Sequence, residues 1–299
     1  MDFAALLAQA KPPKRQTVAV AAAEDPVVLK TLADAYKEDI ANAILCGNED
    51  RIKESALGEG IDISPFSIIH AADEKLAAAA AVAAVREGRA DMLMKGLLQT
   101  SNLLKAVLDK EHGLRGSGLI SHVCVLYSPI LDRMLFIADG GMVTYPDLAA
   151  KVKILENTVR AAKGMGIACP KVAVLAAVET VNPDMPPTLD AAALTLMNKR
   201  GQIKGCVVDG PLAMDLALSS YAAEHKGVKS EVAGQADVLI FPNIESANCA
   251  VKVFSCAGHS IFGGVVMGAA APIVLSSRGD SEQNKLYAIA CAAKIAMNS

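Results

Sequence analysis

Short apolar runs alternate with longer amphipathic segments through the first hundred residues. Residues 17–22 (TVAVAA) have the β-branched, apolar character of a buried strand, and Asp25-Pro26 begins a segment with apolar residues at helical spacing. Strand-like runs at 43–45, 66–70 and 91–94 are separated by helix-like segments at 49–58 and 74–86. This βαβα order predicts right-handed crossovers onto a mostly parallel sheet, with ligand-binding loops at the carboxyl ends of its strands.

The same pattern returns in the second half of the chain. Strand-like runs at 134–139, 171–177, 206–209, 237–241 and 272–275 surround a helix that begins near Leu148, and a last helix covers 282–297. The segment LYSPILDR at 126–133 breaks the periodicity with Pro129. We therefore predict two α/β domains, residues 1–134 with 280–299 and residues 135–279, with a ligand-binding cleft between them.

Composition supports this fold class and narrows the ligands. Of the 299 residues 53% are hydrophobic and only 4% aromatic, with no tryptophan, which favours helices packed on parallel strands over a β-sandwich. The formal net charge of −3 provides no basic field for nucleic acid. An anionic ligand would therefore have to be held by a local group of donors.

The cysteines and the amino terminus indicate in which compartment of the cell we expect the protein. The seven cysteines are single, with no CxxC pair, as in a protein kept reduced. Residues 1–16 fit neither a signal peptide nor a membrane span. We expect a cytoplasmic protein with no membrane partner. The five histidines show no metal-like pairing, so no metal site is expected.

One polar motif lies where the last strand-like run meets the last helix. In LSSRGDSEQNK, residues 275–285, Ser276, Ser277 and Arg278 stand just before a predicted helix start. Helix amides, hydroxyls and a guanidinium can together hold a phosphate or a developing oxyanion. Alternatively, the serines form an ordinary helix cap and Arg278 is solvated.

A second motif, residues 207–219, joins a strand to a helix. Asp209 is predicted to end the strand, Gly210-Pro211 to turn the chain, and Asp215 to lie in the next helix. A carboxylate at a strand end can act as a base or orient a hydroxyl group. Alternatively, Asp209 caps the turn and Asp215 is a surface residue.

Two further motifs follow predicted strands. Asn243, Ser246, Asn248 and Lys252 follow the 237–241 run, as pocket-forming loops do, although Asn and Ser are also common turn residues. Lys95-Gly96 leaves the 91–94 run, and Thr100 or Ser101 can cap the next helix. Lys95 could meet a phosphate or be a solvated loop lysine.

Nucleotide-cofactor and esterase motifs are missing from the sequence. The stretch GGVVMG at 263–268 lacks GxGxxG spacing, and neither a GxxxxGK[ST] phosphate loop nor a GxSxG nucleophile turn occurs.

The four motifs, in this order, resemble the phosphate acetyltransferase and phosphate butyryltransferase family. VDGPLAMDLA, GQADVLIFPNIESAN and LSSRGDS carry the resemblance, and the MKG form at 94–96 with GLRGSGLISHV at 113–123 is more similar to the butyryltransferase branch. The resemblance implies a two-domain fold like that of isocitrate and isopropylmalate dehydrogenases and a homodimer or larger homo-oligomer. It also implies exchange of an acyl group between coenzyme A and phosphate in a ternary complex, with coenzyme A as substrate and no tightly bound cofactor.

The resemblance also assigns residues. It implies Ser277, Arg278 and Asp209 as catalytic residues. It implies substrate binding by Lys95, Thr100, Arg115, Asn243, Asn248, Lys252 and Asn284.

Position 284 departs from the family pattern. Acetyltransferases of the family place an aspartate there as the proposed base for the coenzyme A thiol, and neutral Asn284 cannot take a proton. Asp280, Glu282 or a water held by Asp209 could replace it. Our hypothesis is that the thiol, with an ordinary pKa of about 8.5, ionises with electrostatic help from Arg278 and Lys95.

Other functions are open to this sequence. Phosphate acetyltransferase is the alternative within the family. An NAD-dependent dehydrogenase on the same fold would need paired aspartates and an arginine-rich segment that are not present. The third alternative is a catalytically silent acyl-CoA or acyl-phosphate binding protein, suggested by Asn284, which cannot act as a base.

Overall fold

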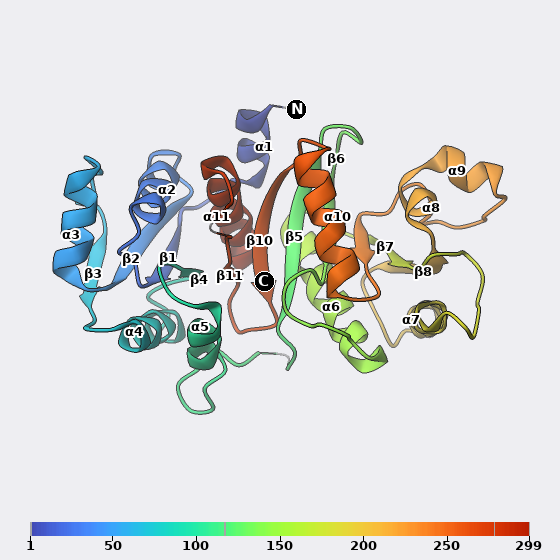
Figure 1. Ribbon diagram of the computed structural model, residues 1–299, viewed down its shortest axis with the longest axis horizontal. Coiled ribbons are helices and arrows are strands. Elements are labelled where there is room, and N and C mark those ends of the chain that lie inside the picture. The colour runs from blue at the N-terminus through green and yellow to red at the C-terminus, as the bar shows by residue number, and fades with distance from the viewer. Residues whose placement is uncertain (1, 117, 278, 299) are drawn as a thin grey trace. The chain divides into compact units, whose positions relative to one another are not determined.

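The computed structural model describes residues 2–116, 118–277 and 279–298. The chain forms two compact units, Met1–Gly118 with Ile261–Ser299 (unit 1) and Leu119–Ser260 (unit 2). Each unit is a mostly parallel sheet covered by helices (Figure 1). The α/β class expected from the sequence is confirmed.

Unit 1 has the strand order β3-β2-β1-β4-β11-β10, in which only β10 and β11 pair antiparallel among the described strands. Its strands are β1 (Gln16–Ala21), β2 (Ala41–Gly47), β3 (Ser67–His70), β4 (Met92–Lys95), β10 (Ile261–Met267) and β11 (Ile273–Val274). Its helices are α1 (Phe3–Ala10), α2 (Pro26–Lys37), α3 (Glu49–Gly58), α4 (Glu74–Arg86), α5 (Thr100–Val107) and α11 (Glu282–Met297).

The crossovers of unit 1 place its helices on two faces. Right-handed connections put α2 and α3 on one face, where α2 packs against α11, and put α4 with α5 on the other (Figure 1). Asp25 and Asp73 begin α2 and α4 by accepting backbone N–H bonds from Val27 and from Lys75 and Leu76. The structure corrects one predicted cap: Thr100 is the first residue of α5, and Gln99 holds the cap position without a side-chain hydrogen bond.

The core of unit 1 is built around α11. Tyr287 and Ile289 are fully buried, and α11 packs against β10. A Cβ on Gly263 of β10 would lie 2.6 Å from the Ala288 Cα, so the close approach of strand and helix requires glycine there.

Unit 2 has the strand order β5-β6-β9-β7-β8, with an antiparallel β5–β6 pair and parallel neighbours from β6 onward. Its strands are β5 (Ser121–Ser128), β6 (Arg133–Ala138), β7 (Lys171–Leu175), β8 (Val207–Leu212) and β9 (Val238–Ile240). Its helices are α6 (Leu148–Gly164), α7 (Pro186–Lys199), α8 (Met214–Leu218), α9 (Ser220–His225) and α10 (Ile244–Cys256).

The segment that broke the predicted periodicity is a hairpin. Ser128 pairs with Arg133 across it, so residues 121–138 form one antiparallel ribbon in unit 2. The compact units accordingly divide at 118 and 260, whereas the sequence analysis placed the boundaries at 134 and 279. The pairing of β10 with β11 and the packing of β10 on α11 keep residues 261–279 with unit 1.

The structure also corrects the predicted end of a strand. Asp209 does not end β8, because the strand continues through Gly210 and Pro211 to Leu212. Asp215 lies in α8 as expected, and its carboxylate is 3.4 Å from the Lys226 ammonium at the surface.

None of the helices in the described part of the chain has the length and apolar character needed to span a membrane.

Candidate functional site

A polar cavity of about 230 Å³ lies at one edge of the unit 1 sheet. Because β1, β4 and β11 run parallel, their carboxyl ends meet at the same edge, and the residues that follow them line this cavity together. The lining residues are Asp25, Val28, Lys95, Gly96, Leu97, Leu98, Ser276, Ser277 and Lys285. We call this the Lys95–Ser277 cavity.

Lys95 is held over the loop that follows β4. Its Nζ donates to the Leu98 carbonyl at 2.9 Å and to the Gly96 carbonyl at 3.2 Å. A Cβ on Gly96 would lie 2.1 Å from the Ala22 carbonyl oxygen, so only glycine permits this loop to pack against the end of β1. Gly96 therefore permits the loop whose carbonyls hold the Lys95 ammonium at the cavity.

Ser277 belongs to a tight loop before α11. Its backbone N–H donates to Asp280 Oδ2 at 2.6 Å, and its Oγ accepts from the Gly279 N–H at 3.4 Å. Ser281 caps the helix by accepting from the Asn284 N–H. The Ser277 hydroxyl thus lies near a helix amino terminus, where an anion is favoured. Arg278 lies outside the described residues.

Lys285 is a cavity residue that the sequence analysis missed. It is only 7% exposed, and its Nζ donates to the Asp280 carbonyl. A lysine in the first turn of a helix is opposed by the helix dipole, so its position alone was a signal of a special role. With Lys95, it gives this cavity two ammonium groups.

Asn284 lies beside the cavity in sequence but not among its lining residues. Its Oδ1 accepts from the Phe262 backbone N–H at 3.2 Å, which ties the start of β10 to α11. The side chain at the position where the resemblance led us to expect an aspartate therefore has a structural hydrogen bond.

Two other predicted residues of unit 1 do not line the cavity. Thr100 begins α5, just beyond the lining residue Leu98. Arg115 is exposed, and its Nε donates to the Leu108 carbonyl at 3.0 Å.

In unit 2, Asn243 follows the carboxyl end of β9, and Asn248 lies in α10 and contacts the loop after β6. Asn243 caps α10 and accepts from the Ser246 N–H at 3.0 Å, and Asn248 Nδ2 donates to the Gly140 carbonyl at 3.0 Å. Sequence reasoning missed Asp139, which is 4% exposed and accepts from the N–H groups of residues 141–143. A buried aspartate shaping the loop after β6 thus positions the carbonyl that Asn248 binds.

The other two predicted residues of unit 2 lie apart from this pair. Asp209 is on β8, two strands away from β9, and its Oδ1 accepts from the neighbouring Gly210 N–H at 2.9 Å. Lys252 is exposed on α10. In the described ranges, no three His, Cys, Asp or Glu side chains are grouped as metal ligands.

Comparison with known proteins assigns the chain to a family. The model of the family described as "Phosphate acetyl/butaryl transferase" matches residues 2–80 and 72–293. A phosphate butyryltransferase from Clostridium acetobutylicum is 48% identical over 99% of both chains, and a phosphate acetyltransferase from Thermotoga maritima is 42% identical over 95% of this chain and 96% of its own.

A solved structure agrees with these sequence relatives. The crystal structure of a branched-chain phosphotransacylase from Enterococcus faecalis superimposes with a TM-score of 0.84 at 32% identity, covering 95% of this chain and all of that one. The chain belongs to the phosphate acetyl/butaryl transferase family.

Proposed function

We propose that this chain is a phosphate acyltransferase that moves a short acyl group, butyryl or similar in size, between coenzyme A and inorganic phosphate. The observation that carries the proposal is the meeting of Lys95, Ser277 and Lys285 on one cavity at the carboxyl edge of a parallel sheet, in a chain of this family. The butyryltransferase relatives at 44–48% identity support a chain longer than acetyl.

The proposed reaction is a direct displacement. An oxygen of hydrogen phosphate attacks the thioester carbon of acyl-CoA, a carbon–oxygen bond forms and the carbon–sulfur bond breaks. Coenzyme A leaves as a thiolate, which takes up the proton that the phosphate gives up. Lys95 and Lys285 would hold the attacking phosphate, with Arg278 as a further ligand of it. The Ser277 hydroxyl would donate to the oxyanion that develops on the acyl carbon.

The same ammonium groups would compensate for the missing catalytic base by stabilising the coenzyme A thiolate. In the reverse direction the thiol must lose its proton before it attacks the acyl phosphate, and Asn284 cannot accept it. Lys95 and Lys285 would lower the free energy of the thiolate by their charge, as cationic neighbours do for cysteine thiols. Lys285 thus extends our hypothesis of electrostatic ionisation, which began with Arg278 and Lys95.

We propose coenzyme A binding for the polar residues outside the cavity. Asn243, Asn248 and Lys252 offer amide and ammonium donors, and Thr100 and Arg115 offer a hydroxyl and a guanidinium. Asp209 stays a predicted catalytic residue. A homodimer or larger assembly, a cytoplasmic location and the lack of a tightly bound cofactor belong to the same proposal.

The direct test incubates the protein with acyl-CoA and phosphate and follows thiol release. The acyl series is acetyl, propionyl, butyryl and isobutyryl. We expect turnover in the presence of phosphate, with kcat/KM highest for a four-carbon acyl group. Absence of turnover with every acyl-CoA would rule out the enzyme, and a clear preference for acetyl would place the chain with the acetyltransferases.

A further inference from the structure

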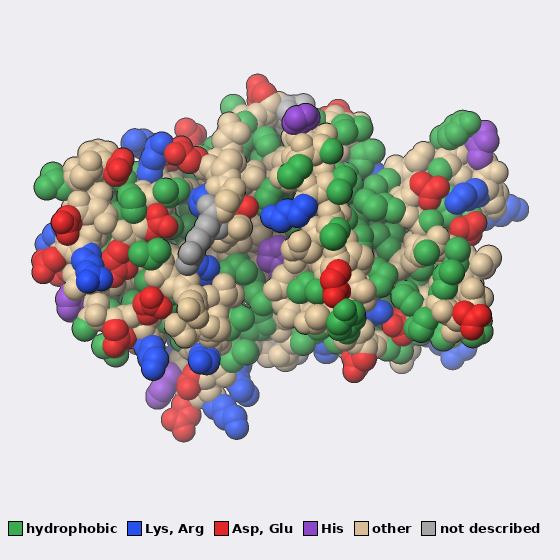
Figure 2. All heavy atoms as spheres, viewed as in Figure 1, with side chains coloured by type: hydrophobic (Ala, Val, Ile, Leu, Met, Phe, Trp, Pro, Cys, Tyr) green, Lys and Arg blue, Asp and Glu red, His purple; other side chains and the backbone are tan. Residues whose placement is uncertain are grey.

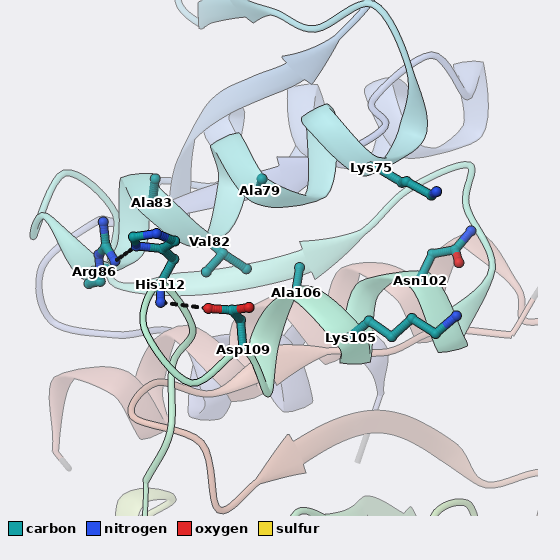
Figure 3. A pocket seen from close by; sticks show the side chains of 10 residues that line it. All are labelled: Lys75, Ala79, Val82, Ala83, Arg86, Asn102, Lys105, Ala106, Asp109 and His112. Atoms are coloured by element: carbon teal, nitrogen blue, oxygen red, sulfur yellow. Dashed lines mark hydrogen bonds between the residues drawn. The ribbon is translucent and has the colours of Figure 1, made fainter.

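A second cavity in unit 1 lies between α4 and α5, outside the Lys95–Ser277 cavity. Its volume is about 470 Å³, within the range of roughly 300–1,000 Å³ usual for small-molecule sites. Its lining residues are Lys75, Ala79, Val82, Ala83, Arg86, Asn102, Lys105, Ala106, Asp109 and His112 (Figure 3). We call it the α4–α5 cavity, and it shares no lining residue with the Lys95–Ser277 cavity.

The middle of the α4–α5 cavity is apolar. Ala79, Val82 and Ala83 of α4 line it together with Ala106 of α5 (Figure 3). Alanine side chains are too short to fill the space between the two helices, although α4 and α5 are in contact elsewhere along their length. We call this apolar middle part the slot; its small side chains and the cavity's volume of about 470 Å³ leave room for a ring.

Lysine or arginine side chains lie at both ends of this slot. Lys75 and Lys105 are at one end with Asn102, and Arg86 and His112 are at the other (Figure 3). Figure 2 shows basic side chains gathered, along with acidic ones, over α4, α5 and the loop that follows. Among the residues that the structure describes, no hydrogen-bond or ion-pair partner occupies the ammonium group of Lys75 or Lys105.

The polar groups at the Arg86 end of the slot already have partners within the protein. Arg86 Nη1 donates to the Glu111 carbonyl at 3.2 Å and lies 3.2 Å from His112 Nδ1. The carboxylate in the lining, Asp109, accepts from the Glu111 and His112 N–H groups, and these bonds lower its pKa. Asp109 is thus engaged by the backbone of its own loop, while both lysines at the opposite end are available to an anion.

We propose that the α4–α5 cavity binds a phosphorylated nucleoside. The base would lie in the alanine slot, and Lys75 and Lys105 would hold phosphate. Asn102 already donates one N–H to Glu74 Oε2 at 3.3 Å, which fixes its amide with a second N–H and a carbonyl oxygen for the edge of a base.

Two sources could supply this ligand. One is coenzyme A, whose nucleotide end carries phosphates; this source rests on the proposed function. It agrees with the topology, because α4 and α5 begin just after β3 and β4, which puts their first turns at the same sheet edge as Lys95 and Ser277. The other source is a free adenine nucleotide that binds independently of the reaction.

The test measures binding by calorimetry to the full chain. The probes are ATP, adenosine 3′,5′-bisphosphate and coenzyme A. The variants are Lys75→Ala/Lys105→Ala, which removes both ammonium groups, and Ala79→Phe, which fills the slot from an exposed position. Lys110→Ala, an exposed lysine outside the lining, is the matched control. Melting curves check that each variant is folded.

The expected result is binding of at least one probe by the parent and by Lys110→Ala, weakened about tenfold for each lysine removed and lost in Ala79→Phe. Coenzyme A is the source if the bisphosphate competes with it and the double variant raises the KM for acyl-CoA at constant kcat. A free nucleotide is the source if ATP binds equally well to protein saturated with coenzyme A.

The proposal is overturned if no probe binds at millimolar concentration, or if the double variant and Ala79→Phe bind as the parent does. Because binding is measured without turnover, these outcomes differ from a failure of the acyl-transfer assay. A protein with no acyltransferase activity could still bind ATP in the slot, and an active acyltransferase could leave the slot empty.

Discussion

Asn284 has a structural hydrogen bond at a position for which the sequence analysis considered a catalytic role. Its Oδ1 accepts from the Phe262 N–H, and Phe262 is buried. The amide therefore pairs the backbone donor of a buried residue, and a buried donor costs about 1–3 kcal/mol when left unpaired.

This hydrogen bond predicts that two substitutions of Asn284 differ in their effect on the free energy of unfolding. Asn284→Ala should lower the free energy of unfolding by about 1–3 kcal/mol, while Asn284→Asp, which keeps an acceptor, should unfold like the parent at neutral pH. Urea titrations of the three proteins provide the measurement. If a missing base limits the reaction, Asn284→Asp would raise the rate by orders of magnitude; we expect a modest change in the pH profile.

Lys285 is the residue that tests the anion site. Lys285→Met keeps the length of the side chain and removes the charge. We expect the KM for phosphate to rise about tenfold, because one charge-assisted contact is lost, and the melting temperature to hold. The control is Lys30→Met on the same face of unit 1, whose exposed ion pair with Glu282 should contribute little to either quantity. An unchanged KM for phosphate would remove Lys285 from the site.

At the scale of elements, a partly buried ion pair joins α6 to α7. Lys151 Nζ lies 2.6 Å from Asp190 Oδ2, and the Lys151 side chain is only 6% exposed. The exposed pair Lys153–Glu156 on α6 has a similar separation of 2.8 Å. The two pairs differ chiefly in their access to water.

That difference predicts unequal costs. Asp190→Ala leaves a buried ammonium group unpaired and should cost about 3 kcal/mol of stability, whereas Glu156→Ala should cost less than about 1 kcal/mol. Denaturant unfolding of both variants in parallel measures the contrast. Equal costs would mean that the ammonium of Lys151 finds water or another partner when Asp190 is gone.

Over the whole molecule, the seven cysteines divide by burial. Cys169, Cys249 and Cys256 are exposed, and the other four are buried. Burial raises the pKa of Cys46 and Cys291 to about 12 and that of Cys206 to about 11. A thiol that is buried and protonated does not react as a nucleophile.

Two measurements follow from these thiols. Iodoacetamide at pH 8 should label the exposed three in the native protein and all seven after denaturation, as read by mass spectrometry.

The raised pKa values mean that folding favours the protonated thiols, so their contribution to stability is full below about pH 9 and is lost as pH rises toward 12. Cys291→Ala should reduce that alkaline loss, and an identical slope would show that Cys291 does not contribute to it.

The sequence by itself determined the α/β class, the helices that bear strong local signals and the family. The bounds predicted for α3, α4 and α11 are those observed, because helix formers and caps such as Asp73 act through neighbours in the chain. The family resemblance, confirmed by the comparisons, needed only four motifs in order. The roles given to Ser277, Arg278 and Asp209 stay predictions.

Only the tertiary structure decided which polar side chains share a cavity. Lys95 and Lys285 are 190 positions apart, and they meet because β4 and β11 are neighbours in the sheet. The same holds for β5, whose pairing with β6 turned a break in periodicity into a hairpin, and for Asp209, which tertiary pairing with β7 keeps inside a strand. Strand pairing and burial depend on residues distant in sequence, and local pattern has no means of recording them.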